Sequence, residues 1–189
     1  MTEEEKRLYT LARNAENNRD YEHALTYYLK MPNNLEAIEK VGEYYYFGRG
    51  CEKDIEKARK YFKLAGDKGN NDAICNLALC TEDITEKVRL YRCAALQGSS
   101  YAMNMVGILI EKYRIEDCGT PYEWYEKAAK AGNLCGMYNL AMHTPDCMTA
   151  LKLLKTAADK GHKASEKLYS RIKELGILSE VIEENERNK

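Results

Sequence analysis

Small and apolar residues recur along this chain at the three- and four-residue spacing of amphipathic helices. Four stretches share one pattern, in which a bulky pair is followed by small residues and then by a glycine, at positions 69, 98, 132 and 161. The bulky pairs are Tyr61-Phe62, Leu90-Tyr91, Trp124-Tyr125 and Leu153-Leu154. Similarity at a nearly fixed interval indicates stacked repeats that share one core. The pattern therefore predicts an all-helical repeat array.

A second pattern precedes each bulky pair and predicts another helix in every repeat. A small residue, three variable positions, a branched apolar residue and a second small residue occur in the segments 37–42, 73–78, 102–107 and 136–141. In two of them the last residue is a glycine, Gly42 or Gly107. A residue with little or no side chain at this point allows a neighbouring helix to approach closely. Each repeat is thus expected to be a helix pair.

Capping residues mark the start of the second helix in each repeat. Oxygen-bearing side chains stand before the expected helices and can accept the unpaired N–H groups of the first turn: Asp20, Asp54, Asp83, Thr120 and Asp146. Thr120 is followed by Pro121 and by Glu123, which together form a capping-box sequence. The repeated glycines suit the left-handed conformation that ends a helix.

Two stretches of the chain resemble the Sel-1-like repeat, a relative of the tetratricopeptide repeat. One stretch runs from Ala37 to Phe62 and makes up the second repeat, and the other runs from Trp124 to Asn133. The resemblance implies an all-α, right-handed superhelix of about five antiparallel helix pairs plus a C-terminal capping helix. Residues 1–33 would be a degenerate first repeat, 34–163 the Sel-1-like repeats, and 164–189 the cap and a polar tail. In the cap, Ile177, Leu178, Val181 and Ile182 are expected to cover the last repeat.

Charge and hydropathy exclude some partners. The chain carries 29 basic and 30 acidic residues, a net charge of −1, which argues against nucleic acid as the main ligand. Its longest apolar run, Val106 to Ile110, is too short for membrane insertion. The acidic N-terminal segment has no apolar stretch typical of a secretory signal. We therefore expect a cytoplasmic protein.

Motifs for catalysis are missing from the sequence. There is no H-E-x-x-H, no G-x-S-x-G and no phosphate-loop lysine signature, and Gly48-Arg49-Gly50 lies in an expected inter-helix loop. Of the three histidines, His23 and His162 are interpreted as ordinary surface residues. We therefore expect no enzyme activity, no cofactor and no metal site.

The seven cysteines allow two interpretations. None forms a C-x-x-C pair, they occupy different repeat positions, and their number is odd, which favours buried or half-buried thiols in a reducing compartment. Some secreted members of the family bridge their helices with disulfides. Cys75 and Cys93 are the best candidates for such a bridge here.

Fifteen tyrosines against two phenylalanines is an unusual ratio. Six of them match core positions of the resembled family: Tyr27, Tyr28, Tyr45, Tyr61, Tyr91 and Tyr125. Tyr44, Tyr46, Tyr101 and Tyr138 do not match core positions. They are interpreted either as interface residues or as half-buried tyrosines with a hydrated hydroxyl.

The resemblance also implies where a partner would bind, because the first helices of tetratricopeptide-like arrays line the concave face. The expected groove residues are Glu39, Glu43, Tyr46, Cys75, Leu79, Asn104, Ile108, Tyr138 and Met142, with Lys167 and Ser170 in the cap. Such a groove suits a protein segment with basic and hydrophobic residues. In the alternative interpretation, Leu79, Ile108 and Met142 are core residues.

The sequence thus favours a non-enzymatic adaptor that binds a protein segment in its concave groove. The first alternative is a disulfide-bridged, cysteine-rich Sel-1-like protein that binds a cell-wall or β-lactam-type ligand. The second is a helical-repeat RNA reader, which would need a basic concave face. Glu39 and Glu43 at expected groove positions argue against it.

Overall fold

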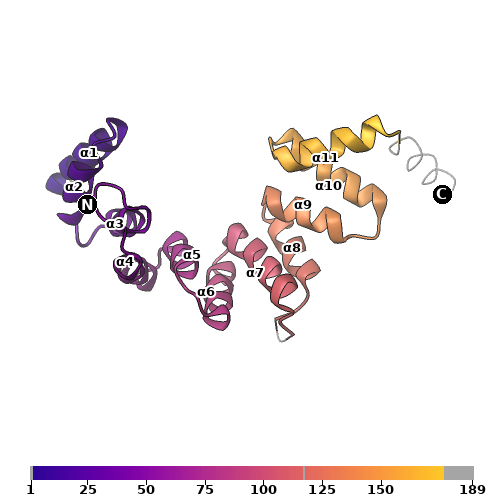
Figure 1. The fold of residues 1–189 in the computed structure, drawn as a ribbon, viewed down its shortest axis with the longest axis horizontal. Coiled ribbons are helices and arrows are strands. Elements are labelled where there is room, and N and C mark those ends of the chain that lie inside the picture. Colours follow the sequence, from indigo (N-terminus) through magenta and orange to yellow (C-terminus); the bar gives the residue numbers. More distant parts are fainter. Residues whose placement is uncertain (1, 117, 177–189) are drawn as a thin grey trace. The chain divides into compact units, whose positions relative to one another are not determined.

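A computed structural model describes residues 2–116 and 118–176, and this part of the chain contains eleven α-helices and no strand (Figure 1). The helices are α1 Glu3–Asn17, α2 Tyr21–Leu29, α3 Leu35–Phe47, α4 Ile55–Asp67, α5 Asn71–Leu79, α6 Ile84–Leu96, α7 Ser100–Tyr113, α8 Pro121–Lys130, α9 Leu134–His143, α10 Cys147–Asp159 and α11 Lys163–Glu174. They correspond to five consecutive pairs followed by α11. The expected all-helical fold is confirmed.

The chain divides into two compact units, of which the first ends at Gln97 and the second begins at Gly98. In the first unit each helix from α1 to α6 packs against the next one along the chain. In the second unit the same holds from α7 to α11. Neighbours in sequence are therefore neighbours in space, which is the packing of a repeat array.

Local capping signals set the helix boundaries. All five expected capping residues accept a backbone N–H at the start of the second helix of their repeat. At α8, Thr120 and Glu123 form the complete capping box, with Pro121 in the first turn. Gly69, Gly98, Gly132 and Gly161 have φ values of 94°, 93°, 84° and 87°, so α4, α6, α8 and α10 are each followed by a left-handed glycine as expected.

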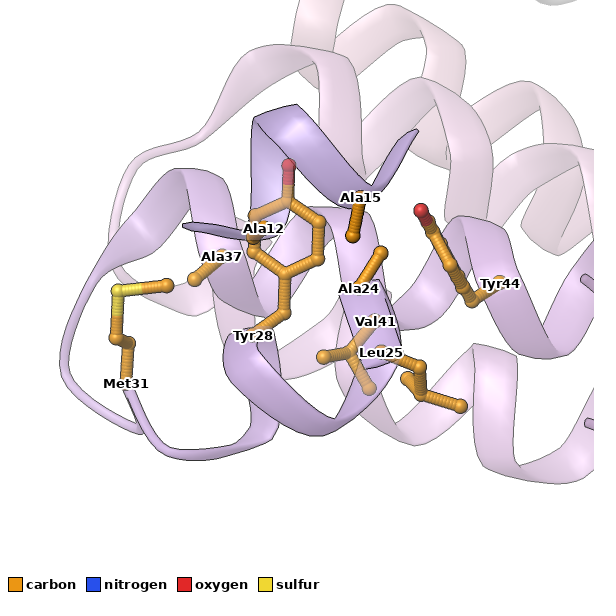
Figure 2. Packing of buried hydrophobic residues seen from close by; sticks show 9 residues of the cluster. All are labelled: Ala12, Ala15, Ala24, Leu25, Tyr28, Met31, Ala37, Val41 and Tyr44. Carbon is orange, nitrogen blue, oxygen red and sulfur yellow. The ribbon is translucent and has the colours of Figure 1, made fainter. Parts of the chain in front are cut away.

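Alanines and tyrosines interlock in the first core (Figure 2). Ala12, Ala15 and Ala24 leave room for the rings of Tyr28 and Tyr44, whose centroids lie 5.9 Å apart in an edge-to-face arrangement. These rings contribute much of the buried apolar area.

Tyr44 corrects one expectation, because it is only 1% exposed although its position does not match the core pattern. Its hydroxyl donates a hydrogen bond to Glu16 of α1, at 3.0 Å. Burial, followed by the charge of Glu16, raises the pKa of Tyr44. A carboxylate supplied by the preceding repeat thus satisfies this buried phenol.

Close helix approach depends on the two glycines that follow branched residues. A Cβ added at Gly42 would lie 2.7 Å from the ring of Phe62, and one at Gly107 would lie 2.6 Å from the ring of Tyr125. The aromatic ring of the second helix therefore rests directly on the backbone of the first. This confirms the role expected for the small residues.

The last described helix, α11, ends before Gly176, whose φ of 74° is left-handed. Ile177, Leu178, Val181 and Ile182, which were expected to cover the last repeat, lie outside the described residues. Among the helices that are described, none is long and apolar enough to cross a membrane.

Candidate functional site

The first unit brings three of the predicted groove residues around one pocket, between α3 and α5. The pocket has a volume of about 150 Å³. Its lining residues are Glu43, Tyr46, Phe47, Phe62, Asn76 and Leu79. Glu43, Tyr46 and Leu79 were predicted from the repeat pattern, whereas the other three were not.

The wall of this α3–α5 pocket is apolar and partly open to solvent. Phe62 is 2% exposed and forms the buried side, pressed against Gly42. Phe47 and Leu79 are 57% and 42% exposed, which is high for large apolar side chains. An apolar concavity with exposed apolar edges is a common form of binding site.

Cations stack on the aromatic side of the pocket. The rings of Tyr46 and Phe47 meet edge to face at 4.9 Å. The guanidinium of Arg49 lies 4.8 Å from the centre of the Phe47 ring, and the ammonium of Lys53 lies 5.7 Å from that of Tyr46. These contacts hold the two rings in place at the end of α3.

An acidic group stands beside the pocket on the same helix. Glu39 accepts hydrogen bonds from Asn70 at 2.7 Å and from Asn76 at 3.3 Å. Burial raises the pKa of Glu39, the hydrogen bond from Asn70 lowers it, and the charge of Glu43 raises it further. The carboxylate of Glu43 pairs with Lys40 at 2.7 Å. Glu39 is therefore a half-buried carboxylate without a cation beside it at ion-pair distance in the described structure.

Two predicted groove residues are buried instead of facing a partner. Cys75 and Asn104 are each 4% exposed, and Asn104 accepts a hydrogen bond from Asn139 at 2.9 Å. In α5 the expected core position, Leu77, is only half-buried. The buried residues of that helix are Ala73, Ile74, Cys75 and Ala78, and Leu77 packs against the core cluster that contains Phe62.

The predicted residues of the second unit lie in different surroundings. Ile108 is half-buried against the cluster that contains Tyr125 and Leu140. Tyr138 packs on the ring of His162, at 5.6 Å between centroids, and Met142 is 57% exposed. Ile108 thus fits the alternative interpretation as a core residue, and Met142 does not. In α11, Lys167 and Ser170 are exposed.

His162 was interpreted as an ordinary surface residue, but it begins helix α11. Its Nδ1 accepts the backbone N–H of Ser165 at 3.3 Å, and its Nε2 lies 3.6 Å from the sulfur of Cys135. Histidine is an uncommon capping residue, and therefore the sequence pattern did not reveal this role.

The cysteines are only partly as expected. Cys75 and Cys80 are buried and Cys51 and Cys118 are half-buried, but Cys93, Cys135 and Cys147 are exposed. All seven lie among the described residues and none is in a disulfide. In the described part of the chain, no three His, Cys, Asp or Glu side chains are grouped so that they could hold a metal ion.

Comparison with known proteins gives a consistent result. The Sel1 repeat profile matches residues 18–31, 35–70, 88–99, 122–133 and 135–162, which together make up more than half of the chain. The comparison with curated protein sequences found no match.

Two solved structures are similar in fold. A Sel1 repeat protein from Oxalobacter formigenes is 24% identical with a TM-score of 0.78, covering 87% of this chain and 75% of that one. The protein c5321, described as a protective antigen present in uropathogenic Escherichia coli strains and displaying an SLR fold, is 22% identical with a TM-score of 0.73. That match covers 87% of this chain and only 40% of c5321.

Proposed function

This chain belongs to the Sel1 repeat family, and on that premise we propose that it is a non-enzymatic module that binds a segment of another protein. Sel1 repeats commonly serve as protein–protein interaction modules and are generally non-catalytic. The α3–α5 pocket of the first unit is the proposed binding site. The observation that carries the proposal is the solvent-open apolar pocket beside the half-buried carboxylate of Glu39.

The size of the pocket suits one apolar side chain. A cavity of about 150 Å³ has room for a benzene-sized group. Phe47 and Leu79, which are exposed at its edge, would be covered by such a ligand. Burial of about 25 cal/mol per Å² of apolar surface would then favour binding.

The carboxylate of Glu39 supports a preference for a basic residue on its side of the pocket, since Arg49 and Lys53 occupy the aromatic side. Glu39 has hydrogen-bond donors but no cation at ion-pair distance among the described residues. A lysine or arginine next to the inserted apolar residue could supply that cation. We therefore propose an apolar residue flanked by lysine or arginine as the recognition element.

We further propose a cytoplasmic location. The odd number of cysteines and their different repeat positions fit a reducing compartment better than a pattern of structural disulfides.

A display library of random peptides tests the binding proposal. Peptides selected on the wild-type protein should share an apolar residue flanked by Lys or Arg. Leu79→Ser should weaken their binding about tenfold or more, as expected for a central apolar contact. The matched control is Leu96→Ser, because Leu96 is an 85% exposed leucine of the same unit that does not line the pocket.

Circular dichroism and hydrogen exchange should show that both variants keep the helical fold. If selected peptides lack this pattern, or bind equally well to the folded Leu79→Ser variant, the proposed site is wrong. If Leu79→Ser unfolds, Phe47→Ser gives the same test at a more exposed position.

A further inference from the structure

A second pocket of the first unit lies between α4 and α6. Its volume is about 360 Å³, and it shares no lining residue with the α3–α5 pocket. We propose that this α4–α6 pocket binds a protein segment in which an apolar residue is flanked by acidic residues. The first unit would then hold two partners of opposite charge on separate surfaces. This inference does not depend on the function proposed for the α3–α5 pocket.

Four basic side chains line the α4–α6 pocket, but two of them are already neutralised. Arg59 pairs with Glu56 at 3.2 Å. Arg89 makes two bonds to the carboxylate of Glu86, at 2.6 and 2.7 Å. Both arginines therefore hold a carboxylate on their own helix, one turn away.

The other two cations, Lys60 and Lys63, are available to a ligand. Both are exposed, and neither is in an ion pair within the part of the chain that the structure describes. Lys63 is close enough to Glu86 to lower the pKa of that carboxyl, although Arg89 lowers it more. They stand three residues apart on α4, so their side chains emerge as neighbours on one helix face. Asp67 is the one lining carboxylate not paired with an arginine. A ligand with two acidic residues can therefore find two cations here.

Apolar side chains lie between the charged ones. Leu77 of α5 is half-buried and Leu90 of α6 is 7% exposed, and both line the pocket. An apolar residue of the ligand can contact these leucines while its acidic neighbours reach the lysines.

The lining favours an acidic peptide over nucleic acid. The lining carries four cations and three carboxylates, a surplus of one positive charge, which is little for a phosphate backbone that carries a charge at every nucleotide. No aromatic side chain is among the lining residues, so there is no platform on which bases could stack.

Fluorescence anisotropy with two labelled peptides tests the proposal on the full chain. The probe has a leucine between glutamates, and its reference has glutamines in their place. Wild-type protein should bind the glutamate peptide more tightly, and added salt should weaken that binding. Lys60→Glu/Lys63→Glu should bind it about tenfold more weakly, because two attractive contacts become repulsive.

The matched control is Lys152→Glu/Lys155→Glu, which changes the same two charges on exposed lysines three residues apart on α10. It should bind like wild type, and so should Leu79→Ser, which alters only the other pocket. If Lys60→Glu/Lys63→Glu misfolds by circular dichroism, Lys60→Gln/Lys63→Gln should still weaken binding, by about threefold.

Three results would overturn the proposal. The first is that the wild type binds the glutamate and glutamine peptides equally well. The second is that the α10 control loses as much affinity as the α4 variant. The third is that a single-stranded RNA oligonucleotide binds more tightly than the glutamate peptide and competes with it. If the α3–α5 pocket turns out not to bind basic peptides, the proposal for the α4–α6 pocket still stands. The two tests use different peptides, and the two pockets share no lining residue.

Discussion

The side chain of Asn70 caps the N-terminus of helix α5 and also donates a hydrogen bond to the carboxylate of Glu39 on α3. Its Oδ1 accepts the backbone N–H of Ala73 at 2.9 Å, and its Nδ2 donates to Glu39 at 2.7 Å. The acidic group of the proposed binding site is therefore tied to the start of the next repeat. A change at Glu39 should affect both stability and binding.

Replacing Glu39 by glutamine should stabilise the protein near neutral pH. Burial raises the pKa of Glu39, so the fold favours its protonated form. The contribution of Glu39 to folding stability is fully present below its ordinary pKa of 4.5. It is lost as the pH rises through the raised pKa that Glu39 has in the folded protein. Glutamine cannot ionise, and its side-chain oxygen can still accept the hydrogen bond from Asn70. The free energy of unfolding of Glu39→Gln should therefore increase relative to that of the wild type as the pH rises.

Urea unfolding at about pH 4 and about pH 7 measures this difference. Glu52→Gln is the control, because Glu52 is exposed. A gain of the same size at both pH values, or a loss for Glu39→Gln at neutral pH, would contradict the expected role of burial.

Gly107→Ala should lower the free energy of unfolding by about 1–3 kcal/mol. The new methyl group would lie 2.6 Å from the Tyr125 ring, and this clash should exceed the gain of about 1 kcal/mol in helix propensity. The fluorescence of Trp124, the one tryptophan of the chain, reports on the same helix as Tyr125. In Gly66→Ala the added Cβ would lie 3.0 Å from Cγ1 of Ile74, a contact that a shift of a few tenths of an ångström relieves, so a smaller loss is expected there. Equal losses in the two variants would show that the tight ring contact is not the cause.

Tyr125→Phe should destabilise the second unit by about 1 kcal/mol. The Tyr125 hydroxyl donates to Glu111 at 2.6 Å, and the ring is 1% exposed. In the variant, the carboxylate of Glu111 still has the Nε2 of His143 as a polar partner, which lies 3.2 Å from its Oε1. Denaturation followed by Trp124 fluorescence checks the loss, with Tyr122→Phe at a 40% exposed position as a neutral control. No change in Tyr125→Phe would mean that this hydrogen bond adds nothing to stability.

Thiol labelling should separate the cysteines by exposure. Cys93, Cys135 and Cys147 should react first with a maleimide in native protein. Cys80 should react slowly, because it is buried and burial raises its pKa to about 11. Mass spectrometry after partial labelling identifies the sites. In denaturant, all seven cysteines should react in protein isolated without reductant. A lower total would instead favour the disulfide-bridged alternative.

The helix pairs, their boundaries and their close contacts could be predicted from the sequence. Asp83 and Asp146 accept backbone N–H groups no more than three residues away, and Gly132 ends its own helix. These interactions are local, and the same residue pattern occurs in several repeats, so each occurrence supports the helix boundaries predicted for the others. Gly42 was predicted for the same reason, since a small residue recurs at its position in four repeats.

The binding surfaces were decided by tertiary structure. Phe47 and Phe62 join Leu79 in one pocket because α3, α4 and α5 meet there, and no local pattern marks Phe47. Cys75 was assigned to the groove by a fixed offset from Leu77, but it is buried, as is Asn104 at the matching position of α7. Tyr44 is buried because Glu16, 28 residues earlier, lies within reach of its hydroxyl. A periodic sequence determines which residues form each helix, whereas the burial of a particular side chain depends on the neighbours against which its helix packs.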